Sequence, residues 1–315
     1  MSSDGPSHGN TPEMFSRDWL RRVGQSFVLA GRDFLIDNGP NWAAAVAFYG
    51  ILSVFPLLLA AVSIASQFVD EQWAVQQITQ WVGDFLPAGE KDLGEIVRQA
   101  QEAGAGAGIV SFLLLLWSGS YVFGAITTAL NIAYDVDEVY GFWKRMLVRL
   151  AMLVTVGVAL LLAIVTPMLM HFVGPVLDAI PAERGTLFRI AATILPPALS
   201  IAAFFLIYRF VPRTRPKWSA ALAGAVVATA LFLLARPLFL VYLSTFAEFN
   251  IIYGFLAVAI ILLFWAWIVA VILLFGGELS AHLQALVIEG RSLEEVLEKH
   301  LQRSPDRKEA GRQNA

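Results

Sequence analysis

Residues 249–277, FNIIYGFLAVAIILLFWAWIVAVILLFGG, contain no Asp, Glu, Lys or Arg. An α-helix needs about 20 mainly apolar residues to cross the roughly 30 Å hydrocarbon core of a bilayer, so this block is long enough to span it. In lipid, a single segment satisfies its backbone polar groups only as a helix. Five further uncharged blocks lie at 38–69, 103–134, 150–177, 190–208 and 218–235. This pattern predicts an all-α, polytopic membrane protein.

The composition supports the same class. Hydrophobic residues make up 57% of the chain and charged residues 15%, against roughly 25% charged residues in an average soluble domain. The chain has no cysteine, which excludes disulfides, thiolate metal sites and thiol nucleophiles. The net charge of -3 says little, because the charges are segregated along the chain.

The uncharged blocks divide the chain into three regions. We expect a disordered N-terminus at 1–14, a six-span membrane domain at 15–290 and a partly disordered tail at 291–315. The expected spans cover about 42–67, 108–133, 149–173, 189–210, 218–243 and 252–277.

The distribution of Lys and Arg predicts the orientation. Most of the 22 basic residues lie before the first span, in the second and fourth connections, and in the tail. The alternate connections are poor in them. By the positive-inside rule both termini are cytoplasmic, which agrees with an even number of spans.

Two segments outside the spans are expected to form amphipathic interfacial helices. The first precedes span one, where apolar residues recur every three or four positions while Asp33 and most arginines lie elsewhere: Trp19, Val23, Phe27, Ala30 and Phe34. The second is the outer loop 70–107, which we expect to form two short helices capping the outer face. Such a pattern suits helices that lie in the membrane surface.

Polar residues and breakers within the spans are the candidates for a transport path. These candidates are Ser53, Pro56, Ser120, Asn131, Arg236 and Glu278. At about 1.5 Å per residue, Arg236 lies near the outer surface, where it anchors the helix, pairs with Glu248 or contacts a headgroup. By the same arithmetic Glu278 emerges on the cytoplasmic side. No carboxylate is expected at mid-membrane, which argues against a buried acidic proton or sodium carrier.

Small residues in the spans indicate close helix packing. Ser120, Gly124 and Thr128 are spaced by four, as are Ala220, Gly224 and Ala228. Small residues at this spacing let helix backbones approach closely. We assign helix-packing roles to Gly124, Gly224 and Gly277.

Glu278 and His282 are four residues apart and share a helix face, and Asp135 ends another span on the same side of the membrane. This spacing permits a metal site but does not specify one, because a solvated helix end gives the same pattern. No phosphate-binding loop, nucleophile elbow, zinc motif or dinucleotide fingerprint is present. We therefore expect no catalytic residue, no metal and no cofactor.

The chain resembles the YihY/BrkB family of bacterial membrane proteins over roughly residues 20–285. The resemblance depends on several short motifs: Ala45-Val46-Ala47-Phe48-Tyr49, Ser53-Val54-Phe55-Pro56, Asn131-Ile132-Ala133-Tyr134, Phe142-Trp143-Lys144-Arg145, Tyr208-Arg209-Phe210-Val211-Pro212, Tyr253-Gly254 and Gly277-Glu278-Leu279. Gly276-Gly277-Glu278 stands where the family more often has Gly-Ala-Glu. This is one small residue in place of another.

The resemblance implies a bacterial inner-membrane protein with six spans and cytoplasmic ends. It also implies a role in serum resistance or in moving envelope lipids or other solutes. An older ribonuclease label of the family disagrees with the residues, because the positive-inside rule accounts for the basic strips.

Three functions from different classes follow. The first is a transporter or translocator of a lipid, amphiphile or organic solute, with membrane lipids as partners and no nucleic acid. The second is a membrane scaffold that binds partners through its outer loop or its tail. The third is a metal-dependent hydrolase using Asp135, Glu278 and His282. The oligomeric state and an inverted repeat of the two halves are left open.

Overall fold

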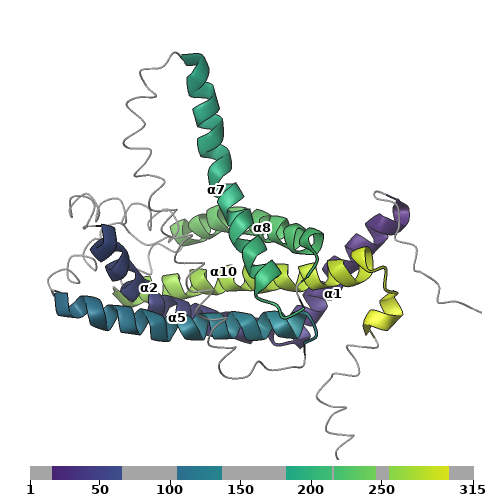
Figure 1. The fold of residues 1–315 in the computed structure, drawn as a ribbon, viewed down its shortest axis with the longest axis horizontal. Coiled ribbons are helices and arrows are strands. Elements are labelled where there is room, and N and C mark those ends of the chain that lie inside the picture. The colour runs from purple at the N-terminus through teal and green to yellow at the C-terminus, as the bar shows by residue number, and fades with distance from the viewer. Residues whose placement is uncertain (1–15, 66–104, 137–181, 215, 246–254, 298–315) are drawn as a thin grey trace, which may run out of the picture.

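A computed structural model describes residues 16–65, 105–136, 182–214, 216–245 and 255–297. The regular elements of these ranges are all helices: α1 (Arg17–Ile36), α2 (Gly39–Ala65), α5 (Ala105–Ala133), α7 (Ala182–Phe210), α8 (Trp218–Thr245), α10 (Phe255–Leu283) and the π-helix η1 (Gln284–Ile288) (Figure 1). The predicted all-α class is confirmed for this part of the chain. The expected third span and the outer loop 70–107 lie almost entirely outside it.

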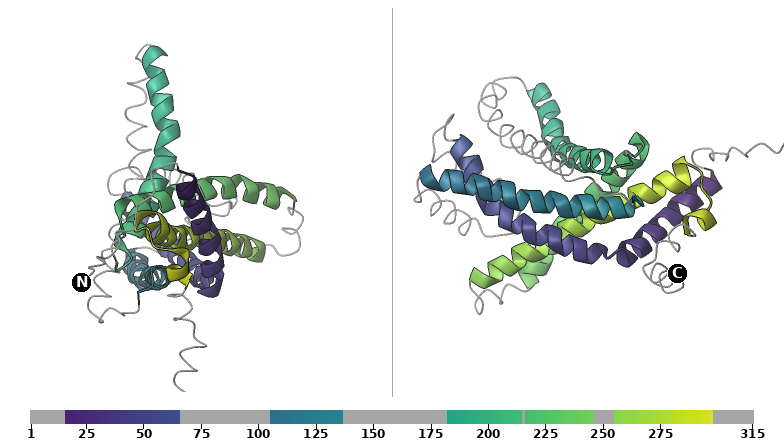
Figure 2. Two further views of the ribbon diagram at one scale, coloured as in Figure 1. Left: turned by 90° about the vertical axis from the view of Figure 1, so that its right-hand side faces the viewer. Right: turned by 60° about the horizontal axis from the view of Figure 1, so that its bottom comes forward.

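Helix α10 is the centre of the arrangement. It contacts α2 and α5 on one side, α8 on the other, and α1 at its C-terminal end. Helices α2 and α5 run side by side, and the N-terminal half of α7 projects away from the other helices (Figures 1 and 2). The main apolar core therefore lies where α2, α5, α7 and α8 meet α10.

Helix α1 is docked on α10 as well as being apolar on one face. Val23, Ala30 and Phe34 of the expected apolar stripe pack against neighbouring helices, and the Phe34 ring meets Phe275 edge-on at 6.3 Å. Phe27 is exposed. Asp33, which we expected to lie away from the apolar stripe, is buried. That expectation was wrong because α10 covers the side of α1 on which Asp33 lies.

The chain turns sharply between α1 and α2. Asn38 has a φ of 57°, in the left-handed region that Asn tolerates better than most residues. At the next residue, Gly39, an added Cβ would overlap the Phe34 ring. The Asn-Gly pair thus allows a close turn that places the start of α2 beside the end of α1.

Three helices continue through their prolines. Pro56 lies within α2 and Pro237 within α8, and α7 runs across Pro196 and Pro197. Neighbouring helices can stabilise backbone groups that proline leaves unpaired in membrane helices. These prolines therefore do not interrupt the helices.

Two stretches of the described chain are long and apolar enough to cross a membrane, Trp218–Leu243 and Ala259–Ile288. Only 17% of an apolar 18-residue segment within the first stretch is buried. A core helix of a soluble protein would be mostly buried, so this exposure favours lipid around α8. That the six expected spans cross the membrane stays a prediction.

Candidate functional site

Glycines on α8 and α10 bring the helices together beside Glu278. A Cβ at Gly224 would lie 2.6 Å from the carbonyl oxygen of Gly276, and a Cβ at Gly276 would overlap the Tyr208 hydroxyl. A Cβ at Gly277 would overlap the Leu130 side chain. Because glycine has no side chain, these three positions allow α5, α7 and α8 to approach the segment of α10 that carries Glu278.

Three ionisable side chains meet where α1 crosses α10. The Nε2 atom of His282 lies 3.2 Å from Oδ2 of Asp33 and 3.7 Å from Oε1 of Glu278. Asp33, Glu278 and His282 are only 2%, 3% and 5% exposed. We call these residues the Asp33–Glu278–His282 cluster. It joins α1 to α10 through buried ionisable groups.

The burial of Glu278 corrects the expectation of a solvated helix end. Helix α10 continues to Leu283 and then into η1, and α1 lies across it. The Arg22 guanidinium reinforces this cover by donating to the Leu286 carbonyl at 2.9 Å. The depth arithmetic takes no account of another helix packing beside Glu278, and the depth itself stays a prediction.

A cavity of about 170 Å³ opens beside the cluster, and we call it the η1 cavity. Its wall comes from the end of α5, the α7–α8 connection, α10, η1 and the residues after η1: Ala133, Tyr134, Asp135, Thr214, Ala281, His282, Gln284, Ala285, Glu289, Arg291 and Val296. His282 belongs to both the cluster and the cavity wall. The imidazole therefore connects the buried carboxylates with the cavity.

A hydrogen bond links α10 with the end of α5. The Tyr134 hydroxyl donates to Oγ of Ser280 at 2.7 Å in a buried position. Burial raises the pKa of the Tyr134 phenol above its usual range, so the group stays protonated and remains a donor. This bond fixes the α5 end of the cavity against α10.

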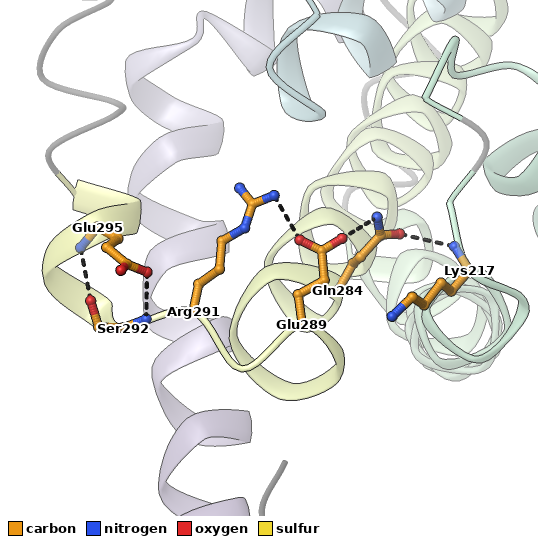
Figure 3. Close-up of polar contacts among 6 residues, drawn as sticks. All are labelled: Lys217, Gln284, Glu289, Arg291, Ser292 and Glu295. Carbon is orange, nitrogen blue, oxygen red and sulfur yellow. Dashed lines mark hydrogen bonds and ion pairs between the residues drawn. The ribbon is translucent and has the colours of Figure 1, made fainter. Parts of the chain in front are cut away.

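A chain of polar contacts connects three residues of the cavity wall with the residue before α8 (Figure 3). The Lys217 backbone N–H donates to Oε1 of Gln284, whose amide donates to Oε1 of Glu289, both at 2.9 Å. Glu289 in turn pairs with Arg291 at 2.7 Å. These contacts link the residue before α8 through η1 to the chain after it.

The turn after Arg291 begins another helical segment. The Glu295 backbone N–H donates to Oγ of Ser292, and the Ser292 N–H donates to Oε2 of Glu295 (Figure 3). This reciprocal pair is a capping box. It starts the helical turn that carries Val296 into the cavity wall.

The remaining transport-path candidates lie apart from the cluster. The hydroxyls of Ser53 and Ser120 donate within their own helices, to the carbonyls of Gly50 and Trp117. Pro56 is buried in α2, and Arg236 is exposed on α8. Glu248, the expected partner of Arg236, lies outside the described residues. A transport role for these four residues stays a prediction.

Two of the helix-packing candidates, Gly224 and Gly277, make the close approaches described above. Gly124 is buried in α5, and its carbonyl accepts a hydrogen bond from Thr128 at 2.9 Å. This contact lies within α5 itself.

Asn131 positions the α7–α8 connection. Its Oδ1 accepts the backbone N–H of Arg213 at 3.1 Å, next to Thr214 in the cavity wall. We expect Asn131→Ala to lower the free energy of unfolding by about 1 kcal/mol, because one hydrogen bond across elements is lost. Thermal unfolding in detergent would measure this loss.

The matched control for Asn131 is Ser120→Ala. It also deletes one polar group on α5, but that hydroxyl bonds only its own helix. We expect a stability change within about 0.5 kcal/mol. Equal losses in the two variants would contradict a positioning role for Asn131.

Asp135 lies in the wall of the same cavity as His282, as the hydrolase alternative requires. It has a φ of 57° and follows the last turn of α5. Among the described residues, however, no three His, Asp or Glu side chains stand in an arrangement able to hold a metal ion.

Comparison with known families identifies the relatives of this architecture. The family model described as "Virulence factor BrkB" matches residues 30–296. This match includes every residue of the cluster and the cavity wall.

The chain belongs to the BrkB virulence-factor family. Its relatives include the UPF0761 membrane protein PBPRA3489 of Photobacterium profundum, 31% identical over 76% of this chain and 75% of the relative. YfkH of Bacillus subtilis, named a ribonuclease-like protein, is 24% identical over 79% of this chain and 91% of its own length. A UPF0761 membrane protein of Prosthecochloris aestuarii is 28% identical over 83% of this chain and 61% of the relative.

These relatives show that the chain is a membrane protein of the BrkB family. The resemblance stated from the sequence motifs is confirmed. No solved structure matches the chain.

Asp33 is the site residue that the sequence analysis missed in this BrkB-family chain. It lies three residues after Ala30, next to Phe34 and seven after Ser26, all of which are buried in α1. Residues at these spacings share one face of a helix. The helical phase of α1 therefore contained the information that Asp33 faces inward.

Proposed function

We propose that this protein is a multi-pass transporter of the bacterial inner membrane that moves a lipid or another amphiphilic molecule. One observation carries the proposal: a cavity with ionisable groups in its wall, which shares His282 with the buried Asp33–Glu278–His282 cluster, lies at the end of helices with apolar outer surfaces. An amphiphile needs a polar environment for its headgroup and an apolar environment for its tail at the same time. The membrane-protein relatives support the cellular setting.

The outer surface of α8 supports an amphiphilic substrate. Leu234, Leu238 and Val241 are 62%, 68% and 64% exposed. Such a surface is stable against lipid tails and unfavourable against water. A substrate with an acyl tail can keep this tail among the surrounding lipids while its polar group enters the protein.

The size of the η1 cavity suits the binding of a lipid headgroup rather than of a complete lipid. Pockets that enclose drug-sized ligands measure about 300–1,000 Å³. The η1 cavity measures about 170 Å³ and contains both acidic and basic groups, including Glu289, Arg291 and His282. A headgroup fits this volume better than a complete lipid does.

The end of α7 has the side-chain pattern of a membrane interface. The Arg209 guanidinium lies 5.6 Å from the Phe210 ring centre and 5.4 Å from that of Trp218. Both rings are exposed. Aromatic residues beside basic ones favour the headgroup level of a bilayer, and the η1 cavity begins only a few residues further on, at Thr214.

A translocation assay tests the proposal. Purified protein is reconstituted into vesicles that contain a fluorescent phospholipid, and a membrane-impermeant quencher is added outside. We expect the quenched fraction to exceed that of protein-free vesicles, because transported lipid reaches the outer leaflet. Asn131→Ala should slow the quenching, since the substitution loosens the chain beside the cavity wall.

Equal quenching in protein-containing and protein-free vesicles, repeated with a fluorescent lysolipid, would overturn the transport proposal. The same preparation tests the hydrolase alternative directly. Divalent-cation-dependent cleavage of RNA or phospholipid that His282→Gln abolishes would replace transport with hydrolysis.

A further inference from the structure

The Asp33–Glu278–His282 cluster contains one carboxylate oxygen with no donor. Oε1 of Glu278 makes no hydrogen bond, although Glu278 is only 3% exposed. Its ion-pair neighbour, Nε2 of His282, is 3.7 Å away, beyond hydrogen-bond distance. Buried polar groups with a purely structural role are normally hydrogen-bonded, so the unsatisfied Oε1 indicates that Glu278 binds a ligand.

The charge around Glu278 indicates what this ligand is. Asp33 and Asp37 act on it from α1 and its C-terminal cap, and Asp135 acts on it from the end of α5. Two other titratable groups lie near it, His282 on α10 and Tyr134 after α5. Acidic groups outnumber the one histidine, so the site favours a cation.

The geometry of the cluster favours a proton over a metal ion. The described residues offer no arrangement of three His, Asp or Glu side chains able to hold a metal ion. A proton needs only one oxygen or nitrogen atom, and it converts a buried carboxylate into a neutral group. Ionisable groups that lie inside membrane proteins commonly form proton relays.

A route to the cluster exists through His282. The imidazole lines the η1 cavity and also faces both carboxylates. The two ring nitrogens of an imidazole let it take up a proton at one atom and release one from the other. A proton from cavity water can thus bind the imidazole and pass to the carboxylate of Glu278, which returns it by the same path.

Proton binding here changes a contact between two helices. Asp33 belongs to α1, whereas Glu278 and His282 belong to α10. Adding a proton to Glu278 neutralises one of the two carboxyl groups that lie beside His282. The protonation state therefore alters the attraction between α1 and α10 beside the cavity.

We propose that the Asp33–Glu278–His282 cluster is a proton-binding site that couples proton uptake from the η1 cavity to substrate movement. The coupling rests on the proposed transport function, whereas the binding of a proton at Glu278 does not.

Infrared difference spectroscopy tests proton binding without any transport. Protein in lipid vesicles is compared between about pH 8 and about pH 5, a range in which exposed carboxylates of ordinary pKa remain mostly ionised. We expect a carbonyl band of a protonated carboxyl group to grow on acidification. Glu278→Gln should lose this band, whereas Glu294→Gln, an exposed glutamate outside the site, should keep it.

His282→Gln provides a second variant that leaves the carboxylates in place. We expect it to shift the pH at which the Glu278 band grows, because the partner of this carboxylate changes. Size-exclusion elution like that of the wild type shows that each variant is folded. A band that is absent in the wild type, or that persists in Glu278→Gln, would overturn the proton site.

Vesicles with an imposed pH gradient test the coupling. With the fluorescent phospholipid as probe, a gradient of one pH unit should change the wild-type rate by up to about tenfold, the ratio of proton activities. In Glu278→Gln the ratio of rates with and without the gradient should fall to one. A wild-type ratio of one would overturn coupling and leave transport standing, whereas no movement above protein-free vesicles would overturn transport and the coupling with it.

Discussion

Gly224→Ala is expected to destabilise the protein by about 1–3 kcal/mol, a cost typical of overpacking a well-packed interior. An added Cβ would lie 2.6 Å from the Gly276 carbonyl oxygen and 2.7 Å from the Ser280 Cβ. The first of these atoms belongs to the α10 backbone, so no side-chain rotation relieves the contact. Helices α8 and α10 would have to separate, and the wall beside Glu278 would shift with them. Thermal unfolding followed by size-exclusion chromatography measures this loss.

The matched control, Gly24→Ala, should have the opposite sign. Gly24 also lies inside a helix, α1, but nothing stands within 4 Å of an added Cβ. Alanine is about 0.5–1 kcal/mol better than glycine in a helix interior, so this variant should be as stable as the wild type or more stable. If both variants unfold at the same temperature, the close approach of α8 to α10 is wrong.

Gly277 illustrates how the identity of the neighbouring atom decides the cost. An added Cβ there meets the end of the Leu130 side chain. A leucine can change rotamer, whereas the carbonyl beside Gly224 cannot move without its helix. The Gly-Ala-Glu form that the resemblance leads us to expect in relatives therefore fits this backbone if Leu130 moves.

The helical class followed from charge patterning alone. Uncharged blocks such as 218–235 and 249–277 are long enough to span a bilayer, and α8 and α10 lie on them. A lipid environment leaves helices as the one solution for such single segments, so local sequence was sufficient. The direction of α7, whose N-terminal half leaves the other helices, depends on packing that no local pattern encodes (Figure 1).

The candidate site was only half visible in the sequence. Glu278 and His282 lie four residues apart, so helical geometry alone put them on one face. Asp33 is more than two hundred residues away, and its contact with His282 exists only because α1 docks on α10. Asn131 was singled out for its polarity, whereas its bond to the Arg213 backbone depends on the fold of the α7–α8 connection.

The close helix packing at the glycines also buries the cluster. Gly276 and Gly277 let Tyr208 and Leu130 approach α10, and the Tyr208 hydroxyl donates to the Leu273 carbonyl at 2.7 Å. This packing excludes water from the turn that carries Glu278. Because water is excluded, the carboxylate interacts more strongly with His282 and Asp33 than it would in solvent.

His282→Ala is expected to destabilise the protein by about 3 kcal/mol or more, because it removes a buried imidazole that faces two buried carboxyl groups. The loss includes the packing of the imidazole, which is almost fully buried. Thermal unfolding of the purified variant in one detergent, at one protein concentration, measures it.

A double-mutant cycle separates the electrostatic part from the packing part. Asp33→Asn removes one of the two negative charges, so His282→Ala should cost less in this background than in the wild type. Residues in direct contact typically show coupling energies of 0.5–3 kcal/mol. Glu294→Gln serves as the reference for an exposed carboxylate, since it should show no coupling with His282→Ala. Additive effects of Asp33→Asn and His282→Ala would mean that the 3.2 Å contact does not hold α1 on α10, and the proton would then have no helix contact to change.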